Sequence, residues 1–331
     1  MKSTGPDRRA ALKTLAGTAA VLATSSWRDA YAQAGAYPSK AIRIVVPFAA
    51  GGPTDLMARV VGKALSQSMK QPVIVDNKPG GGGVIGLSDV MQQPSDGYTL
   101  VFPSILAVTN PALMPNYPFD TLRDFSPVTV VGFIPHALVV RSDFAAKTVA
   151  DLVSLGKAGS LAYGSSGNGT SAHLAGAMFA DRAGLRMVHV PYRGAGPALQ
   201  DLLGGQIQCM FLDMTLALSQ IQAGKLRALA VAPARRVPLL PEIPTIAESG
   251  YPGFDIHAWY GLMVRSGTPG PLIDRLALEV NRALETPEVR ETFTQQGIVA
   301  GGMPPTEFTA LVRSDLAMWK RTIADLRITL Q

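Results

Sequence analysis

The chain has 331 residues, and 47% of them are apolar while 16% are charged, which supports a sizeable buried core and argues against intrinsic disorder. At about 150 residues per domain, this length suggests two domains. The formal charge of +6 is too unevenly placed to indicate a nucleic-acid partner. Residues 1–34 hold five of the 30 basic and two of the 24 acidic residues, so the remainder has 25 basic and 22 acidic residues, a net of +3.

The first 34 residues have the organisation of a secretory signal peptide. A basic stretch is followed by a weakly apolar run over 15–24 and by small residues at Ala30-Tyr31-Ala32. Within the basic stretch, residues 8–13 read RRAALK and resemble a twin-arginine export signal. We therefore expect residues 1–34 to be cleaved near 32–34 and the mature chain to lie free in the periplasm, because no cysteine follows to carry a lipid anchor. A disordered basic tail is the alternative.

The first half of the mature chain alternates between short apolar runs and segments of helical period. Strands are expected over 42–46, 73–75 and 98–102, with helical spacing of apolar residues between the first two and a glycine-rich turn and helix before the third. This alternation indicates βαβ units and a parallel sheet that is buried on both faces.

A second alternating series follows a proline-rich passage over 111–127. Its expected elements are strands over 137–141, 161–164, 187–190, 208–212 and 226–231, with helices around 170–182, 197–203 and 215–222. A proline-dense loop over 233–252, a strand over 258–264 and two C-terminal helices complete the chain. The sequence thus predicts two α/β lobes.

One internal echo supports two lobes. Residues 46–53 and 190–197 share the pattern V-P-aromatic-x-x-small-Gly-Pro, and each closes an apolar strand and opens a helix with proline in its first turn. Two related lobes are one interpretation of this echo, and the chance similarity of two ordinary strand-to-helix turns is the other.

Four predicted helices begin in small residues, over 48–55, 80–86, 165–173 and 192–196. The unpaired N–H groups of a helix N-terminus attract anions, and glycine lets a ligand approach the backbone. Such starts on both lobes could hold a small molecule with two carboxylates between them. Ordinary turns and caps are the alternative at each single position, and 80–83 reads better as a structural turn.

No enzymatic constellation emerges from the sequence. Two glycine loops spell the dinucleotide fingerprint, but neither has the required strand and acid around it. The sequence has no G-x-S-x-G elbow, and its four histidines have no metal-ligand spacing. The single cysteine, Cys209, lies in an apolar run and is expected to be a packed thiol rather than a nucleophile. We therefore expect no catalysis, no metal and no cofactor.

Ten motifs together resemble a known family, the periplasmic solute-binding proteins of tripartite tricarboxylate transporters, often called Bug proteins. They span nearly the whole mature chain in order: YPSK (37–40), IRIVVPF (42–48), GGPTD (51–55), VDNKPG (75–80), DGYTL (96–100), HLAG (173–176), HVPYRG (189–194), DLLGG (201–205), GKLRALA (224–230) and PTIAE (244–248).

The resemblance implies a two-lobed Venus-flytrap α/β fold, with a mostly parallel sheet flanked by helices in each lobe. We expect residues 35–136 to form the first lobe, 137–257 the second, and 258–331 a strand and helices that return to the first. In the family, a small organic carboxylate lies between the lobes, is held mainly by backbone amides and water, and is handed to membrane subunits of the transporter. The protein is expected to act as a monomer.

Residue by residue, the resemblance places ligand contacts on both lobes. The first-lobe contacts would be Phe48, Ala49, Gly51, Gly52, Asp55 and Ser104. The second-lobe contacts would be Ser165, Ser166, Gly167, Asn168, Gly169, Thr170, His173, Tyr192 and Asp213.

Some of these contacts carry their own expectations. A carboxylate facing an anion would repel it, so Asp55 is expected to cap its own loop or order a water, and the same caution applies to Asp213. His173 could donate to an anion, cap or pack. Ala49-Ala50 stand where the family commonly has two prolines, so the stiffness of this loop differs. The alternatives to a transport protein are an exported enzyme acting on a small carboxylic acid and a binding protein that reports to a sensor kinase.

Overall fold

The computed structural model describes residues 37–256 and 258–329, so the predicted signal peptide over 1–34 lies outside the described residues. The chain divides into two compact units, residues 1–40 and 41–331. In the first unit the described residues include a cis peptide bond between Tyr37 and Pro38. The second unit contains every helix and strand discussed below.

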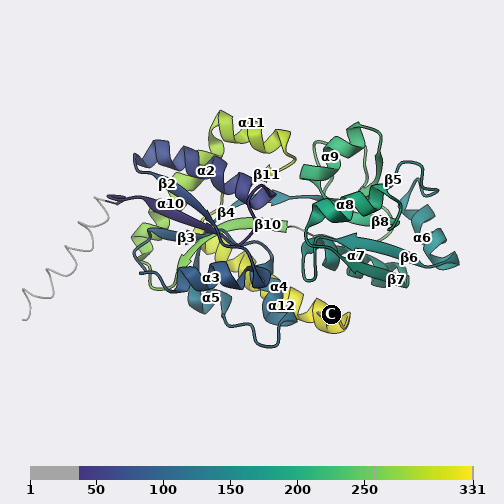
Figure 1. Ribbon diagram of the computed structural model, residues 1–331, viewed down its shortest axis with the longest axis horizontal. Coiled ribbons are helices and arrows are strands. Elements are labelled where there is room, and N and C mark those ends of the chain that lie inside the picture. The colour runs from purple at the N-terminus through teal and green to yellow at the C-terminus, as the bar shows by residue number, and fades with distance from the viewer. Residues whose placement is uncertain (1–36, 257, 330–331) are drawn as a thin grey trace, which may run out of the picture. The chain divides into compact units, whose positions relative to one another are not determined.

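Two separate sheets, each flanked by helices, organise the second unit (Figure 1). The six-stranded sheet has the order β11-β4-β10-β3-β1-β2. Its strands are β1 (Ile42–Val46), β2 (Val73–Asn77), β3 (Thr99–Val101), β4 (Phe125–Ile134), β10 (Ala258–Arg265) and β11 (Val299–Ala300). The strands β1 to β4 all point the same way, because β10 pairs antiparallel with both β3 and β4.

The five-stranded sheet has the order β7-β6-β8-β5-β9. Its strands are β5 (His136–Arg141), β6 (Leu161–Ser165), β7 (Met187–Pro191), β8 (Cys209–Asp213) and β9 (Leu226–Val231). Here β5 is the antiparallel strand, inserted between β8 and β9. The expected two-lobed α/β fold with mostly parallel strands is confirmed. In each sheet the central antiparallel strand, β10 or β5, directly follows a point where the chain crosses between the sheets, and the short edge strand β11 is also antiparallel to β4.

The topology corrects the interpretation of the internal echo. Read from the edge, β2-β1-β3-β10-β4 matches β7-β6-β8-β5-β9, so β1 corresponds to β6 and β2 corresponds to β7. The echo compares the loop after β1 with the loop after β7, which are not equivalent positions. The two related sheets are real, but the shared pattern reflects a local requirement, since both loops lead from a strand into a helix with proline in its first turn.

Helices follow most strands and cover the faces of both sheets. Around the six-stranded sheet lie α2 (Pro53–Met69), the 3-10 turn η1 (Gly81–Gly83), α3 (Val84–Met91), α4 (Leu106–Leu113), α5 (Thr121–Asp124), α10 (Gly270–Glu285), α11 (Pro287–Gln295) and α12 (Pro305–Asp325). Around the five-stranded sheet lie α6 (Val149–Ala158), α7 (Ser171–Ala183), α8 (Ala195–Leu203) and α9 (Met214–Gln222). The C-terminal strand and helices thus pack with the first half of the chain.

The ten-residue strand β4 was not predicted, because Pro127 extends the proline-rich passage into it. Proline cannot donate to a strand ladder and is found at edges and bulges. In the structure, Pro127 pairs with Met263 at a register shift between β4 and β10, where the ladder is already irregular. After it, Val128, Val130, Val131 and Ile134 are fully buried, as in a central strand.

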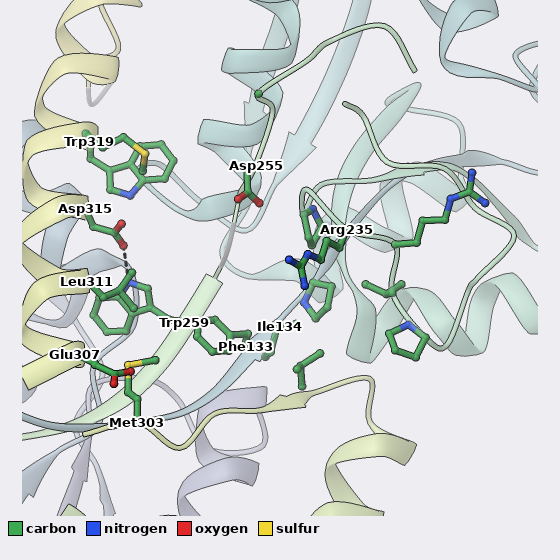
Figure 2. A pocket seen from close by; sticks show the side chains of 18 residues that line it. Phe133, Ile134, Arg235, Asp255, Trp259, Met303, Glu307, Leu311, Asp315 and Trp319 are labelled. Carbon is green, nitrogen blue, oxygen red and sulfur yellow. Dashed lines mark hydrogen bonds between the residues drawn. The ribbon is translucent and has the colours of Figure 1, made fainter. Parts of the chain in front are cut away.

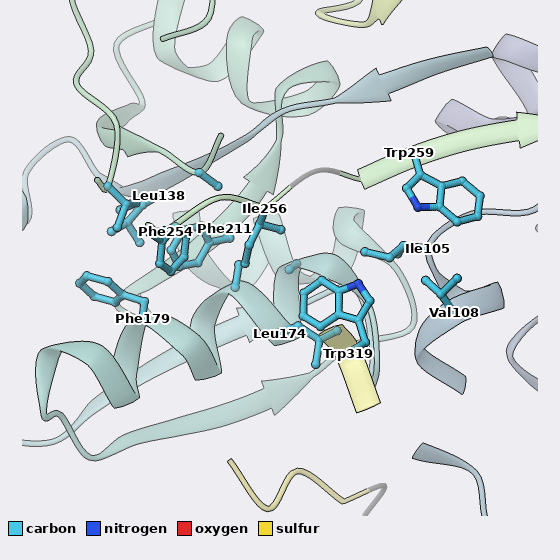
Figure 3. Packing of buried hydrophobic residues seen from close by; sticks show 14 of the residues in the cluster. Ile105, Val108, Leu138, Leu174, Phe179, Phe211, Phe254, Ile256, Trp259 and Trp319 are labelled. Carbon is cyan, nitrogen blue, oxygen red and sulfur yellow. The ribbon is translucent and has the colours of Figure 1, made fainter. Parts of the chain in front are cut away.

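Large aromatic side chains make the apolar core continuous between the two sheets (Figure 3). Phe179, Phe211 and Phe254 pack beside the five-stranded sheet, while Trp259 and Trp319 pack near Ile105 and Val108 of the other half, and all five aromatic residues are buried. Because a core of this kind is close-packed, the helices that it supports hold their ends in defined positions.

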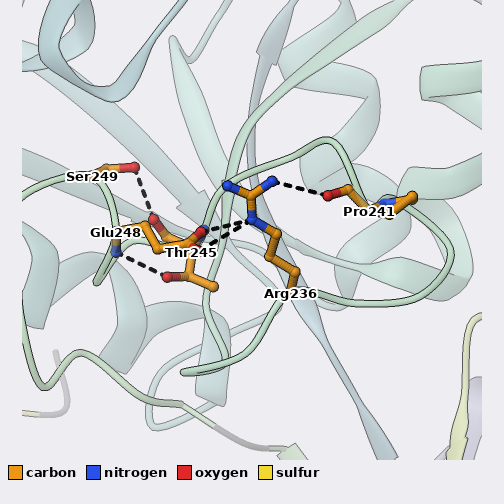
Figure 4. Close-up of polar contacts among 5 residues, drawn as sticks. All are labelled: Arg236, Pro241, Thr245, Glu248 and Ser249. Atoms are coloured by element: carbon orange, nitrogen blue, oxygen red, sulfur yellow. Dashed lines mark hydrogen bonds and ion pairs between the residues drawn. The ribbon is translucent and has the colours of Figure 1, made fainter.

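The proline-dense loop after β9 is braced by Arg236 (Figure 4). Its Nε donates to Glu248 Oε2 at 2.9 Å, and its Nη1 donates to the carbonyl of Pro241 at 3.0 Å. Thr245 and Glu248 form reciprocal side-chain to backbone bonds, with Thr245 N donating to Glu248 Oε2 at 2.8 Å. Backbone hydrogen bonding to Thr245 and the Arg236 guanidinium hold the pKa of Glu248 below its ordinary value.

Candidate functional site

A cavity of about 420 Å³ is lined from both sheets, and we call it the helix-end cavity. It is lined by Phe48, Gly51, Gly52, Pro53, Thr54, Ser104, Ile105, Leu106, Ser166, Thr170, Ser171, Gly194, Ala195, Gly196, Asp213, Leu216 and Tyr260. These residues lie in the loops after β1, β3, β6, β7 and β8, at the start of the following helices, and in the returning strand β10. Such an edge, at the carboxyl ends of parallel strands, is where open α/β sheets bind ligands.

Five helices in the described part of the chain begin at this cavity, namely α2, α4, α7, α8 and α9. Each helix N-terminus presents unpaired N–H groups and the positive end of the helix dipole. Among the described residues that line the cavity, none is a lysine, arginine or histidine. Its attraction for an anion therefore comes from backbone N–H groups and from the hydroxyl group of Ser104, which accepts from the N–H of Leu106 and can donate its own proton.

The loop between β1 and α2 is held in place by the buried carboxylate of Asp55. Asp55 Oδ2 accepts from the backbone N–H of Gly51 at 2.9 Å and from Arg59 Nε at 3.0 Å, while Oδ1 accepts from Asn77 Nδ2 at 3.0 Å. The same amide of Asn77 donates to the carbonyl of Phe48 at 3.2 Å. Burial works to raise the pKa of Asp55, but the bonds from Arg59, Gly51 and Asn77 outweigh it and hold that pKa below its ordinary value. Asp55 therefore caps its own loop, as expected.

The equivalent loop, between β6 and α7, is held by the buried His173 and the half-buried His189. Ser165 Oγ lies 2.7 Å from His189 Nε2, and the backbone N–H of Gly169 donates to His173 Nδ1 at 3.1 Å. The rings of His173 and His189 stack with centroids 3.8 Å apart. Burial lowers the pKa of His173 to about 4, and burial together with His173 lowers the pKa of His189 to about 3. Both rings are thus neutral, and His173 caps and packs rather than facing the cavity.

The structure brings seven of the fifteen predicted contacts together around the cavity. The residues in its lining are Phe48, Gly51, Gly52, Ser104, Ser166, Thr170 and Asp213. Those outside its lining are Ala49, Asp55, Ser165, Gly167, Asn168, Gly169, His173 and Tyr192. Among the latter, Asp55 and His173 bond to Gly51 and Gly169 of their own loops. Tyr192 donates its hydroxyl to Asp201 Oδ2 at 2.7 Å, and burial and this bond raise its pKa to about 12.

The contacts that sequence reasoning missed are mainly first residues of helices. They are Pro53, Thr54, Ile105, Leu106, Ser171, Gly194, Ala195, Gly196, Leu216 and Tyr260. The signal for six of them was available, because the predicted helix starts over 48–55, 165–173 and 192–196 include Pro53, Thr54, Ser171, Gly194, Ala195 and Gly196. The other glycine-rich start, over 80–86, lies outside this lining and forms the turn η1, as expected, with Asn110 Nδ2 donating to the carbonyl of Gly82 at 2.8 Å.

Asp213 is the one charged side chain among the described residues of this lining. Its Oδ1 lies 2.8 Å from Nε2 of His136, and that same nitrogen lies 3.0 Å from Ser171 Oγ. His136 is buried at the start of β5, directly opposite Asp213 in the ladder between β5 and β8. The polar end of the cavity is therefore built where the chain crosses between the two sheets.

A larger cavity of about 750 Å³ lies elsewhere, and we call it the indole cavity (Figure 2). It is lined by Phe133, Ile134, Pro135, Pro233, Arg235, Arg236, Val237, Pro238, Gly253, Asp255, Trp259, Val299, Met303, Glu307, Leu311, Asp315, Met318 and Trp319. Trp259 Nε1 donates to Asp315 Oδ2 at 2.8 Å, and Arg235 lies across the cavity from the α12 side chains. Sequence reasoning did not anticipate this cavity.

The two cavities lie on opposite faces of β10. Trp259 lines the indole cavity and its neighbour Tyr260 lines the helix-end cavity, and successive side chains of a strand point to opposite faces. Of the two, the indole cavity is walled by the body of α12 rather than by helix N-termini. The convergent backbone donors therefore favour the helix-end cavity as the ligand site.

Other kinds of site find little support within the described ranges, 37–256 and 258–329. No cluster of three or more histidine, cysteine or acidic side chains could hold a metal ion there, and no helix there is both long and apolar enough to cross a membrane. Cys209 is buried in β8, and burial raises the pKa of its thiol to about 12, so it is the packed thiol that was expected.

Comparison with known proteins agrees with this geometry. A protein in the tcbD-tcbE intergenic region of Pseudomonas sp. strain P51 is 39% identical over 319 residues, covering 96% of this chain and 94% of that protein. The solved structure of the periplasmic binding protein BugD is 32% identical, with a TM-score of 0.79, covering 89% of this chain and all of that one. The structure of Rpa4515 from R. palustris with adipate is 32% identical, with a TM-score of 0.82, covering 88% and 99% of the two chains.

The family model described as "Tripartite tricarboxylate transporter family receptor" (TctC) matches residues 57–328, nearly all of the described chain. Together with the two related sheets and the cavity between their helix ends, this match identifies the chain as a member of the TctC family of solute-binding proteins, which includes the Bug proteins.

Proposed function

We propose that this protein binds a small organic carboxylate in the helix-end cavity and delivers it to the membrane subunits of a tripartite tricarboxylate transporter. The observation that carries the proposal is the convergence of five helix N-termini on a cavity whose described lining has no basic side chain. Hydrogen bonds from N–H groups to a charged acceptor contribute about 1.5–3 kcal/mol each, so a few of them suffice for specific binding. The adipate bound by the relative Rpa4515 supports a carboxylate as the ligand.

The binding residues of this proposal are the predicted contacts that line the cavity. Gly52 stands before α2 and Ser166 before α7, so one carboxylate can receive donors from both sheets. Gly51 and Thr170 shape the same loops, because the Gly51 N–H donates to Asp55 and the Thr170 hydroxyl donates to the carbonyl of Gly167. A direct bond already joins the two sides, because Thr109 Oγ1 of α4 donates to the carbonyl of Gly169 at 3.1 Å. A ligand between the loops adds to such contacts.

Capture follows from a shift between open and closed arrangements of the two sheets. The chain passes between them at residues 134–136 and again between β9 and β10, and rotation at these crossings changes the width of the cavity. A ligand that contacts both sides favours the closed arrangement by its differential affinity. Closing also excludes water, which strengthens the bonds between N–H groups and carboxylate.

The wider biological role follows the family. Residues 1–34 would direct export to the periplasm, residues 35–136 and 258–331 would form one lobe and 137–257 the other, and the protein would act as a non-enzymatic monomer. Reporting a bound carboxylate to a sensor kinase is the second candidate partner interaction, because the same closed arrangement can serve either partner.

A thermal-shift screen with an organic-acid panel tests the proposed function. Dicarboxylates, tricarboxylates, acidic amino acids and aromatic acids should include members that raise the melting temperature, because a ligand that binds only the folded state stabilises it. NAD and nucleotides serve as controls and should give no shift. Stabilisation by a nucleotide with no response to any acid would contradict the proposal.

A further inference from the structure

Asp213 places a carboxylate side chain in a cavity whose helix ends attract anions. Asp213 is the single charged group in the described lining, and 15% of its side chain is exposed. We propose that Asp213 makes the cavity selective for carboxylates that also carry a hydrogen-bond donor, a hydroxyl or an ammonium group. This inference rests on the proposed function, because it names the chemical class of ligand for the same cavity.

The position of Asp213 leaves its carboxylate available to a ligand. It is the N-cap residue of α9, where an aspartate usually accepts a bond from the N–H groups of the first helical turn. Here the side chain makes no such bond, and Oδ1 instead faces His136 Nε2 at 2.8 Å. An ionised carboxylate has about four acceptor positions, so one contact leaves most of them for groups inside the cavity.

His136 orients Asp213 without neutralising it. Nε2 lies within bonding distance of both Asp213 Oδ1 and Ser171 Oγ, while Nδ1 is buried and has no hydrogen-bond partner among the described residues. A ring protonated on both nitrogens would bury an unpaired N–H, which is costly. We therefore assign the single proton to Nε2, which leaves the negative charge of Asp213 in place.

The cavity consequently offers a ligand both hydrogen-bond donors and a hydrogen-bond acceptor. Helix N-termini supply donors for the carboxylate of the ligand, and Asp213 supplies an acceptor beside Tyr260 and Ser171. A ligand with only carboxylates would place like charges in one small cavity. A ligand with a hydroxyl or ammonium group can donate to Asp213 and convert that repulsion into a charge-assisted bond. The geometry thus favours hydroxy acids and amino acids over unsubstituted acids.

Calorimetric titration of the full chain with matched pairs of acids tests this selectivity. The pairs are succinate with malate and with aspartate, glutarate with glutamate, and adipate with 2-aminoadipate. Within the pair that binds, we expect the donor-bearing acid to bind at least about tenfold more tightly, the effect of one hydrogen bond to a charged group. Asp213→Asn should reduce this preference to less than about threefold, by weakening the donor-bearing acid and strengthening the plain one.

A matched control separates selectivity from a general loss of charge or fold. Asp181→Asn removes an exposed carboxylate on α7, outside both cavities, and should leave the preference unchanged. Equal affinity of the wild-type protein for both members of a binding pair would overturn the inference while leaving the proposed function intact. An equal weakening of both members by Asp213→Asn would assign Asp213 a structural role only. Binding of no acid at all would instead contradict the proposed function.

Discussion

The helix-end cavity and the indole cavity lie on the two faces of β10 and are lined by different kinds of groups. Tyr260 faces the ends of helices, loops of glycine and serine, and a single carboxylate, whereas Trp259 faces a second tryptophan, methionines and the body of α12. The indole cavity is the larger, at about 750 Å³ against about 420 Å³. Size and apolar surface alone would favour the indole cavity, so our proposal for the ligand site depends on the direction of the backbone dipoles.

This contrast predicts that side chains of the indole cavity matter more for stability than those of the helix-end cavity. Trp259→Ala should lower the free energy of unfolding by about 3–5 kcal/mol, because it removes a fully buried indole and its bond to Asp315. Tyr260→Phe, on the other face, should lower it by less than about 1 kcal/mol. Urea denaturation measures both, and a smaller effect for the tryptophan would contradict the contrast.

For ligand binding, the order should be reversed. Ser166→Trp places a large side chain in the helix-end cavity and should weaken binding of the tightest carboxylate at least about a hundredfold, the equivalent of two lost charge-assisted bonds. Val299→Trp, which fills the indole cavity from an exposed position in β11, is its matched control and should change affinity by less than about tenfold. Similar losses in both variants would show that the cavities are not functionally distinct.

Acidification should destabilise the protein through the two histidines that hold the loop between β6 and α7. His173 and His189 have pKa values lowered to about 4 and 3 in the folded state, so their stabilising effect is complete above pH 6.5 and is lost as the pH falls below it. Between pH 6.5 and 5, each should cost up to about 1.4 kcal/mol of unfolding free energy per pH unit. His189→Gln should reduce the dependence of the unfolding free energy on pH, measured by denaturation at several pH values. An unchanged pH dependence would contradict the role of the histidines in holding the loop between β6 and α7.

The smallest expected effect is a change in tryptophan fluorescence, which tests whether binding in the helix-end cavity changes the indole cavity. Both tryptophans of the described chain line the indole cavity and neither lines the helix-end cavity. In the Trp27→Phe variant, tryptophan emission should shift by a few nanometres when a carboxylate binds, because rotation at the two crossings between the sheets alters the surroundings of Trp259 and Trp319. Binding seen by calorimetry with unchanged emission would separate the two cavities.

Much of this architecture was predictable from local pattern, and the exceptions have physical causes. Apolar runs and helical spacing located most strands, but Pro127 concealed β4 because its bulge exists only once β10 has returned to pair with it. The echo between 46–53 and 190–197 joins positions that the sheet order makes non-equivalent, so it reflects similar local needs although the two lobes that it suggested are present.

For the site, the loops were predictable and the directions of their side chains were not. Asp55 turns inward because Gly51, Arg59 and Asn77 surround its carboxylate, and Arg59 and Asn77 come from different elements. His173 turns inward because His189, from the neighbouring strand, stacks on it. Gly51 and Arg59 each lie four residues from Asp55. The contacts with Asn77 and between the two histidines join residues more distant in sequence, so these follow from the folded arrangement rather than from spacing.

A crystal structure with the tightest-binding carboxylate of the panel would test the central claim most directly. We predict that one carboxylate lies in the helix-end cavity. Its oxygens should lie 2.7–3.2 Å, the usual distance for such bonds, from backbone N–H groups at the start of α2 and at the start of either α7 or α8. A carboxylate that instead lies in the indole cavity, paired with Arg235, would contradict the account.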